Sequence, residues 1–82
     1  MALVTKDNVK KGQTVYACCD ERPYYSSCYN EAIITDIFED HYLYKDLGTN
    51  IENVWGFYDT DVDNSTVAVF TTEKEAKDWI SR

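Results

Sequence analysis

The chain has 82 residues, of which 44% are hydrophobic and 15% aromatic, and a formal net charge of −7 at pH 7. This length predicts a single domain, residues 1–82, without room for a second lobe. A negative field of this size repels nucleic acids and anionic membranes and attracts basic partners, so we expect no direct binding of DNA, RNA or membrane.

No segment predicts export or membrane insertion. The apolar stretch at residues 1–4 is too short for a signal-peptide core, and no apolar run approaches the ~20 residues that a membrane helix needs. Three cysteines without a secretion signal are typical of reduced thiols. We therefore expect a cytoplasmic protein.

The acidic residues are concentrated in the middle of the sequence. Residues 12–72 hold eleven carboxylates against only two basic side chains, Arg22 and Lys45. Residues 1–11 have a net charge of +2, and the last ten residues have none. Such segregation exceeds what solubility alone requires and favours a binding surface of one sign.

The first half of the chain predicts a helical turn, a strand and a loop, in that order. Residues 5–11 suit one helical turn capped by Thr5 and stopped by Gly12. Residues 13–19 are rich in β-branched and aromatic side chains and predict a strand. Residues 20–30 carry the only proline and several Ser, Asn and Asp residues, which predict a loop.

Two hairpins are expected next. The apolar, β-branched run at 31–38 predicts the strongest strand, and a tight turn at Glu39-Asp40 joins it to a strand at 41–45. After a break at 46–50, strands at 54–58 and 66–70 predict a second hairpin around the polar tip at 61–65.

The sequence ends in a predicted helix. Thr72 stands three residues before Glu75, the spacing of a capping box. Ala76, Trp79 and Ile80 share one face at helical spacing, so Trp79 is expected to dock the helix against the open end of the sheet. On the outer face, opposite charges four residues apart join Glu73 to Lys77 and Lys74 to Asp78.

Five short strands and one terminal helix predict a mainly β (α+β) fold, either a small five-stranded antiparallel sheet or an SH3-like open barrel with one C-terminal helix. The segment 9–16, in which Gly12 and Gln13 precede Val15-Tyr16, resembles the opening of many SH3-like barrels. The segments 32–45 and 69–76 are similar to small acidic bacteriophage accessory proteins of that shape. The resemblance implies an inhibitor of a host or defence protein, anti-CRISPR types included, acting in the host cytoplasm; it carries over no functional residue.

The cysteines do not predict a metal site. Adjacent residues of a strand point to opposite faces, so Cys18 and Cys19 cannot easily reach one zinc ion together with Cys28 and His41. A disulfide from Cys28 to either Cys18 or Cys19 is left open. We expect no metal and no cofactor.

Other chemical motifs are incomplete. Asp59, Asp61 and Asp63 resemble the first half of an EF-hand loop, but Asn64 stands in place of the glycine and Phe70 in place of the bidentate glutamate. No hydrolase or phosphate-binding motif occurs, and the single histidine follows Asp40 at a turn. We expect no enzymatic activity; a thiol nucleophile built from Cys28 and His41 is the one catalytic alternative.

The acidic residues and the aromatic excess together predict a surface that binds a basic protein, with carboxylates in place of phosphates and tyrosines in place of bases. Tyr42 and Tyr44 share one face of a strand, so they either complete the core or stand exposed as anchors. The partner-binding candidates are Asp36, Glu39, Asp40, Asp46, Asp59, Asp61, Asp63, Tyr42 and Tyr44. The expected function is a small inhibitor that covers the nucleic-acid-binding surface of a host or defence protein.

Two alternatives come from other functional classes. An oligomer that sequesters a nucleotide between aromatic side chains would need converging Arg and Lys residues, of which the middle of the chain has two. A structural subunit of a larger assembly would carry its acidic residues only for solubility.

Overall fold

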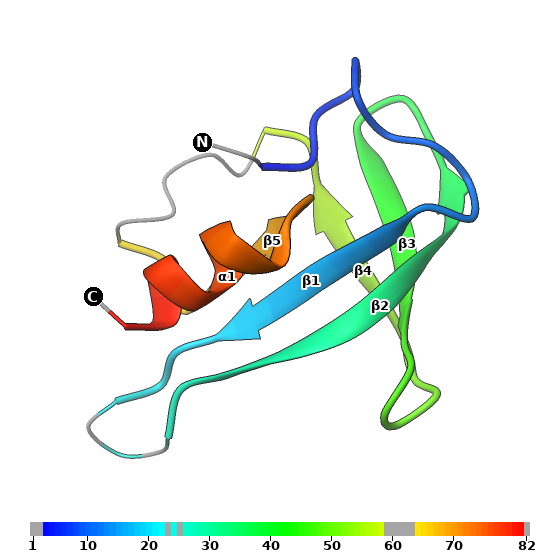
Figure 1. The fold of residues 1–82 in the computed structure, drawn as a ribbon. Helices are drawn as coiled ribbons and strands as arrows, with labels where there is room; N and C mark the ends of the chain where they lie inside the picture. Colours follow the sequence, from blue (N-terminus) through cyan, green and yellow to red (C-terminus); the bar gives the residue numbers. More distant parts are fainter. Residues whose placement is uncertain (1–2, 23, 25, 59–63, 82) are drawn as a thin grey trace.

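Five strands and one helix form the described part of the chain (Figure 1). The computed structural model describes residues 3–22, 24, 26–58 and 64–81. The elements are β1 (Thr14–Cys19), β2 (Cys28–Ile37), β3 (His41–Asp46), β4 (Glu52–Gly56), β5 (Val67–Phe70) and α1 (Glu73–Ile80). All neighbouring strands are antiparallel, in the order β4-β3-β2-β1-β5, and the sheet curls into a half-barrel. The predicted mainly β class is confirmed.

The predicted first hairpin is confirmed. β2 and β3 pair directly, and the Phe38 amide donates to the His41 carbonyl at 2.9 Å. The register shifts between Ile34 and Asp36, which leaves Thr35 as an extra residue on β2. Such a bulge bends the strand and increases its twist, which helps the long β2 follow the curl of the sheet.

The predicted second hairpin is wrong. β4 pairs with β3, while β5 lies at the other edge of the sheet and pairs with β1, with Phe70 opposite Tyr16. The connection 57–66 is too long for a tight hairpin turn, so it does not force its flanking strands together. β4 also begins two residues earlier than predicted, at Glu52, and β2 extends back into the predicted loop, to Cys28.

Two hydrophobic cores lie on opposite faces of β1 and β5. The concave face of the sheet buries the first core: Val4, Val15, Ala32, Ile34, Tyr42, Tyr44, Phe57 and Val69. Helix α1 covers the second: Cys18, Ala68, Phe70, Ala76 and Trp79. Because side chains alternate along a strand, β1 and β5 are buried on both faces, whereas the outer face of β3 and β4 has no helix over it.

Helix α1 begins as predicted, but Trp79 docks it on one face of β1 and β5 and not at the open end of the sheet. Its N-cap Thr72 accepts a hydrogen bond from the Glu75 amide at 3.3 Å, and the predicted pairs Lys77–Glu73 and Lys74–Asp78 form at 3.0 and 2.9 Å. Trp79 is 6% exposed, with its ring centroid 6.2 Å from that of Phe70 on the edge strand β5. No helix in the described ranges is long and apolar enough to cross a membrane.

The N-terminal segment covers the outer edge of β5. Leu3 forms a β-bridge with Phe70, and the Val4 amide donates to the Val69 carbonyl at 3.3 Å. The following turn is closed by the Val9 amide bonding to Thr5, and it is capped by Asn8, whose side chain accepts from the Thr5 amide at 2.8 Å. Gly12 has φ +86°, a backbone angle that glycine adopts readily, and it lies in a second turn that the Gln13 amide closes by donating to the Lys10 carbonyl at 3.1 Å. The predicted single helical turn over residues 5–11 with Thr5 as its cap is therefore wrong.

Candidate interaction surface at the open end of the half-barrel

The strands give the half-barrel two ends. The β2–β3 turn, residues 38–41, lies at the hairpin end. The opposite end, called the open end here, is formed by the connection 20–27 between β1 and β2 and by the turn 47–51 between β3 and β4. In Figure 1 both connections of the open end lie at the bottom of the view. The predicted acidic residues are divided between these ends.

At the hairpin end the predicted carboxylates have basic side chains as neighbours. The side chain of Glu39 is 99% exposed, and its carboxylate lies 3.7 Å from Lys6 Nζ, which also bonds to the carbonyls of Glu39 and Phe38. Asp40 lies 2.6 Å from Nδ1 of His41, and the hydrogen bond from His41 lowers the pKa of the Asp40 carboxyl. Positive charge at Lys6 thus offsets part of the negative field at this end.

Asp36 and Asp46 are tied to local backbone. Asp36 is half-buried, and its Oδ1 accepts from the Ile37 amide at 2.9 Å. Asp46 is 9% exposed, and its Oδ1 accepts from the amides of Gly48 at 2.8 Å and Thr49 at 3.3 Å. Asp46 therefore closes the β3–β4 turn and is buried, so it is not an exposed surface residue.

Tyr42 and Tyr44 are core residues, so their prediction as exposed anchors is wrong. They are 0% and 6% exposed. The ring of Tyr42 lies 5.1 Å from Phe57 and 6.4 Å from Trp55, centroid to centroid. Burial, followed by the nearby Asp46 carboxylate, raises the pKa of Tyr44. Tyr42 and Tyr44 are two residues apart on β3, so both face the concave side. Trp55 of β4 and Phe57, which follows β4, pack against the ring of Tyr42 there.

Asp59, Asp61 and Asp63 lie outside the described residues. Their predicted role as an acidic tip that contacts a partner stays a prediction.

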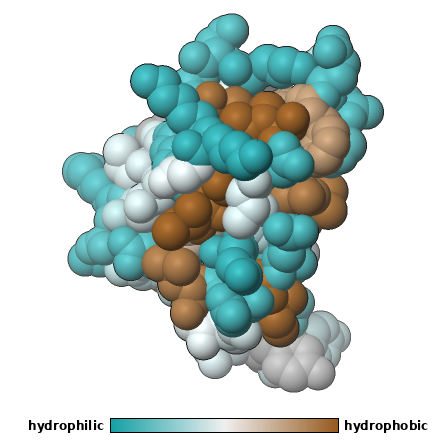
Figure 2. Space-filling view, turned by 90° about the vertical axis from the view of Figure 1, so that its right-hand side faces the viewer, coloured by the Kyte–Doolittle hydropathy of each residue, from teal (hydrophilic) through white to brown (hydrophobic). Residues whose placement is uncertain are grey.

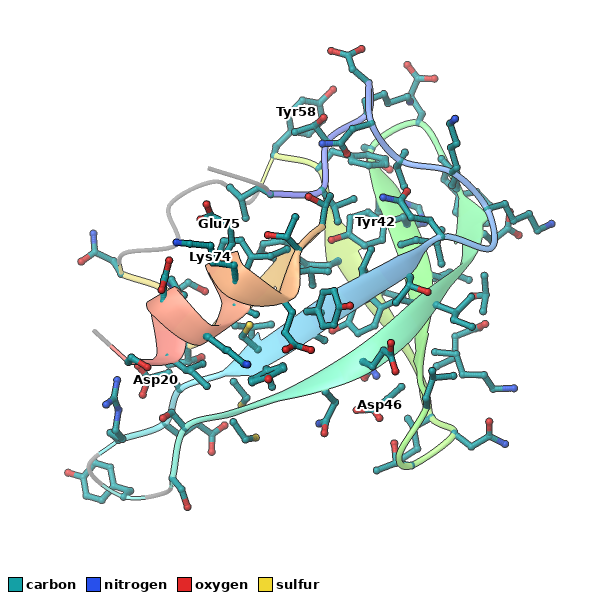
Figure 3. The ribbon with its side chains drawn as sticks, in the orientation of Figure 1. Asp20, Tyr42, Asp46, Tyr58, Lys74 and Glu75 are labelled. Carbon is teal, nitrogen blue, oxygen red and sulfur yellow. The ribbon has the colours of Figure 1, made fainter. Side chains whose placement is uncertain are left out.

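A hollow of about 220 Å³ opens on the concave face near the open end. It is lined by Ala17, Cys18, Cys19, Asn30, Tyr44, Asp46, Asn53 and Val67 (Figure 3 labels Asp46). The lining offers amide, phenol, thiol and carboxylate groups but no basic side chain among the described residues. Its volume is below the roughly 300–1,000 Å³ of typical small-molecule sites. The hollow has room for one side chain of a partner rather than for a nucleotide.

Three exposed glutamates, here called the open-end acids, lie on the elements of the open end: Glu21 in the connection 20–27, Glu31 on β2 and Glu52 at the start of β4. None of them forms an ion pair with another described residue, whereas Arg22 is already engaged by Asp20 at 2.9 Å. Glu31 belongs to this end because its carbonyl accepts from the Leu47 amide at 3.0 Å. Glu52 lies opposite Lys45 in the ladder, and its carboxylate accepts from the Thr35 hydroxyl at 2.8 Å. The sequence placed these glutamates in the acidic middle, but nothing in it grouped them together.

Exposed apolar side chains accompany the open-end acids. Leu47 and Ile51 in the β3–β4 turn are 48% and 58% exposed, and Val54 on β4 is 62% exposed. Figure 2 shows hydrophobic residues interrupting the hydrophilic surface on the right-hand side of Figure 1. Apolar area beside charge is the composition of a protein-binding surface. These side chains supply exposed apolar area, whereas Tyr42 and Tyr44 are buried.

Comparisons with known proteins identify no relative. No family model, no curated protein and no solved structure matches the chain. The function therefore has to be argued from the chemistry of the surface.

The described residues do not bring together Cys28 and His41, the one catalytic alternative that the sequence left open. Cys28 begins β2 at the open end, while His41 begins β3 at the hairpin end, about 30 Å away by the usual rise along a strand. A thiol–imidazole pair between them is excluded by that separation. Within the described ranges, no group of three His, Cys, Asp or Glu residues is placed to hold a metal ion.

Replacing Asp46 by alanine should destabilise the protein by about 1–2 kcal/mol, because the amides of Gly48 and Thr49 lose their acceptor inside a partly buried turn. Urea denaturation measures this loss. Glu31→Ala removes an exposed carboxylate without such bonds and should stay within about 0.5 kcal/mol of the parent. Equal stability of the two variants would contradict the structural role of Asp46.

Proposed function

We propose that this chain is a non-enzymatic protein-binding module whose open end occupies the basic, nucleic-acid-binding surface of another protein. The observation that carries the proposal is the segregation of charge between the two ends. The open-end acids form no ion pair with a described residue, whereas Lys6 and His41 neighbour the acids of the hairpin end. A molecule polarised in this way approaches a basic surface with its open end first.

The chemistry of the open end suits a basic, phosphate-binding partner. Carboxylates of Glu21, Glu31 and Glu52 stand in for phosphates, and the exposed Leu47 and Ile51 supply apolar contact beside Glu31 and Glu52. The hollow on the concave face accepts one basic side chain, since its lining holds the Asp46 carboxylate and the amide oxygens of Asn30 and Asn53. Each of these groups is an acceptor for a guanidinium or ammonium donor.

The shape adds a narrower hypothesis about the class of protein. A curled five-stranded antiparallel sheet with a terminal helix is compatible with the SH3-like barrel that the sequence resembles. Small phage accessory proteins of this shape inhibit host or defence proteins, and an anti-CRISPR type of inhibitor is included in this proposal. The expected place of action is the cytoplasm, that of the host if the chain is phage-encoded.

The geometry favours this function over a nucleotide-sequestering oligomer. Phosphate groups need converging cations, and the described lining of the hollow contains none. Of the two basic residues in the middle of the chain, Arg22 is paired with Asp20. No observation specifically favours a structural subunit.

Reversing the open-end charges should abolish binding to the partner. In affinity capture from a bacterial lysate at low salt, the variant E21K/E31K/E52K should retain at least tenfold less of any specific basic partner than the parent, because electrostatic capture is lost. The matched control D7K/E39K/D40K makes the same change in net charge at the hairpin end and should keep the partner. A third variant, D59K/D61K/D63K, tests the predicted tip.

Two outcomes would overturn the proposal. Equal loss in the first two variants would mean that only net charge matters, and no loss in either would mean that the acids do not bind the partner. Retained binding after reversal at Asp59, Asp61 and Asp63 would exclude that tip alone.

A further inference from the structure

The two edges of the sheet differ in whether another segment covers them. The outer edge of β5 is covered by Leu3 and Val4, through the bridge to Phe70 and the hydrogen bond to Val69. Strand β4 ends the sheet on the other side, and among the described residues no strand pairs with its outer edge. Proteins commonly protect such edges with lysine, proline, a bulge or a covering segment. β4, with the sequence ENVWG, carries neither lysine nor proline and has a regular register with β3.

The ladder geometry shows which backbone groups of β4 face outward. The Ile51 carbonyl accepts from the Asp46 amide, and the Phe57 amide donates to the Asp40 carbonyl, both at 3.0 Å. Bonded and non-bonded pairs alternate in an antiparallel ladder, so Asn53 and Trp55 bond to β3. The amide and carbonyl of Val54, which lies opposite Leu43, therefore point away from the sheet. Val54 is also the most exposed apolar residue of the strand, at 62%.

We propose that β4 pairs antiparallel with β4 of a second copy of this chain, about a two-fold axis at Val54. The amide and carbonyl of each Val54 then bond to those of the other copy, and the two half-barrels join into one continuous sheet. On the outer face, Leu43 and Val54 of one copy then form one row of neighbouring side chains with Val54 and Leu43 of the second copy. This buries an apolar row that the single chain leaves exposed.

The charges specify this register. A two-fold axis at Val54 places Glu52 opposite Gly56 of the second copy, so that each Glu52 has Lys45 on its other side and no like charge facing it. An axis at Glu52 would bring the two Glu52 carboxylates face to face, which is destabilising. An axis at Asn53 or Trp55 would also join outward backbone groups, but it would set Val54 opposite Glu52 or Gly56 of the second copy and lose the apolar pair. Of the positions within β4, Val54 best combines outward backbone groups with apolar, uncharged pairing.

This dimer goes beyond the proposed function and is tested without any partner. Pairing along one short strand buries less area than a standard interface, so we expect a dissociation constant on the order of 100 μM. Each copy carries a net charge of −7, so added salt should strengthen the dimer by screening repulsion. Salt weakens capture of a basic partner, so failure of one proposal is distinguishable from failure of the other.

Sedimentation equilibrium from 10 μM to 1 mM protein measures the association. The parent should approach the dimer mass at the highest concentration, and Val54→Lys should remain monomeric because it places two ammonium groups on the axis. Ile51→Lys is the matched control: it makes the same change at a residue 58% exposed, just outside the strand, and should dimerise like the parent. A monomeric parent at 1 mM, or equal loss in both variants, would overturn the proposal.

Cross-linking tests the register. Val54→Cys in a C19S/C28S background places two thiols opposite each other across the axis, and oxidised glutathione converts them into an intermolecular disulfide while it is reduced to two glutathione molecules. Glu52→Cys in the same background places the thiols about 13 Å apart along the strands, too far for a bond. Non-reducing electrophoresis should therefore show a covalent dimer at least tenfold enriched for the Val54 variant. Equal cross-linking of the two variants would overturn the register.

Discussion

Replacing Trp79 by alanine should lower the free energy of unfolding by about 3–5 kcal/mol, the usual range for removing a buried large aromatic side chain. Trp79 is 6% exposed and packs against Phe70 in the core beneath α1. The helix is only eight residues long, and a helix this short is not stable without tertiary contacts. Its docking therefore depends mainly on Trp79 and Ala76.

Chemical denaturation followed by far-UV circular dichroism and by tryptophan fluorescence measures the effect. Tyr24→Ala is the matched control, since it truncates an aromatic side chain that is 88% exposed and should change stability by no more than about 0.5 kcal/mol. An unchanged denaturation midpoint for Trp79→Ala would mean that the helix is not docked on the sheet. A loss of helix signal well before the main transition would mean that α1 and the sheet unfold separately.

The helix and the first hairpin were predictable because their determinants are local in sequence. Thr72 and Glu75 mark the start of α1 through a cap that spans one turn, and the Glu39-Asp40 turn brings its flanking strands together directly. Strand positions followed from apolar, β-branched runs. Their ends were less accurate: β4 begins at Glu52 because polar Glu52 and Asn53 still pair with Lys45 and Tyr44 of β3 beside an exposed edge.

The partner of β5 was not predictable from neighbouring residues. Val67–Phe70 is apolar on both faces, which indicates burial on both sides but not which strand lies beside it. The concave core buries Val69, while the second core buries Ala68 and Phe70, so β5 fits only where α1 can cover its outer face. That requirement places β5 next to β1, whose Cys18 faces the same helix.

The negative charge of the candidate site was predictable from the sequence, but the positions of its residues in the fold were not. In the sequence, nothing distinguishes Asp46 from the other acids of the middle segment. In the structure, its carboxylate accepts hydrogen bonds from the Gly48 and Thr49 amides inside a turn. The alternation along β3 showed that Tyr42 and Tyr44 share a face but not that this face is concave. Glu21, Glu31 and Glu52 belong to the same end of the sheet only because the antiparallel order puts the end of β1 and the starts of β2 and β4 at that end.

Oxidation should join Cys19 to Cys28 and leave Cys18 as a thiol. The sequence allowed either cysteine as partner for Cys28, and the register decides between them, because Cys19 lies directly opposite Cys28. The Ile34 amide bonds to the Gln13 carbonyl at 2.9 Å, and the alternation of the ladder makes Cys19 and Cys28 a bonded pair. The Cα atoms of such a pair are about 5.5 Å apart, within the range that a disulfide spans. Cys18 faces the opposite, helix-covered side, and burial raises its pKa to about 12.

With oxidised glutathione as oxidant, the two thiols lose two hydrogens to form the bond, and the glutathione disulfide is reduced to two thiols. Closing a loop of this length should stabilise the protein by about 2.5–3 kcal/mol in the chain-entropy description. Burial and the neighbouring Glu21 raise the pKa of Cys19, so less thiolate is present at neutral pH and the bond should form faster at pH 9 than at pH 7. Peptide mapping and urea denaturation measure both effects: C19S and C28S should abolish the bond and the added stability, while C18S should keep the bond. A disulfide that contains Cys18, or an oxidised protein no more stable than the reduced one, would contradict the register of β1 and β2.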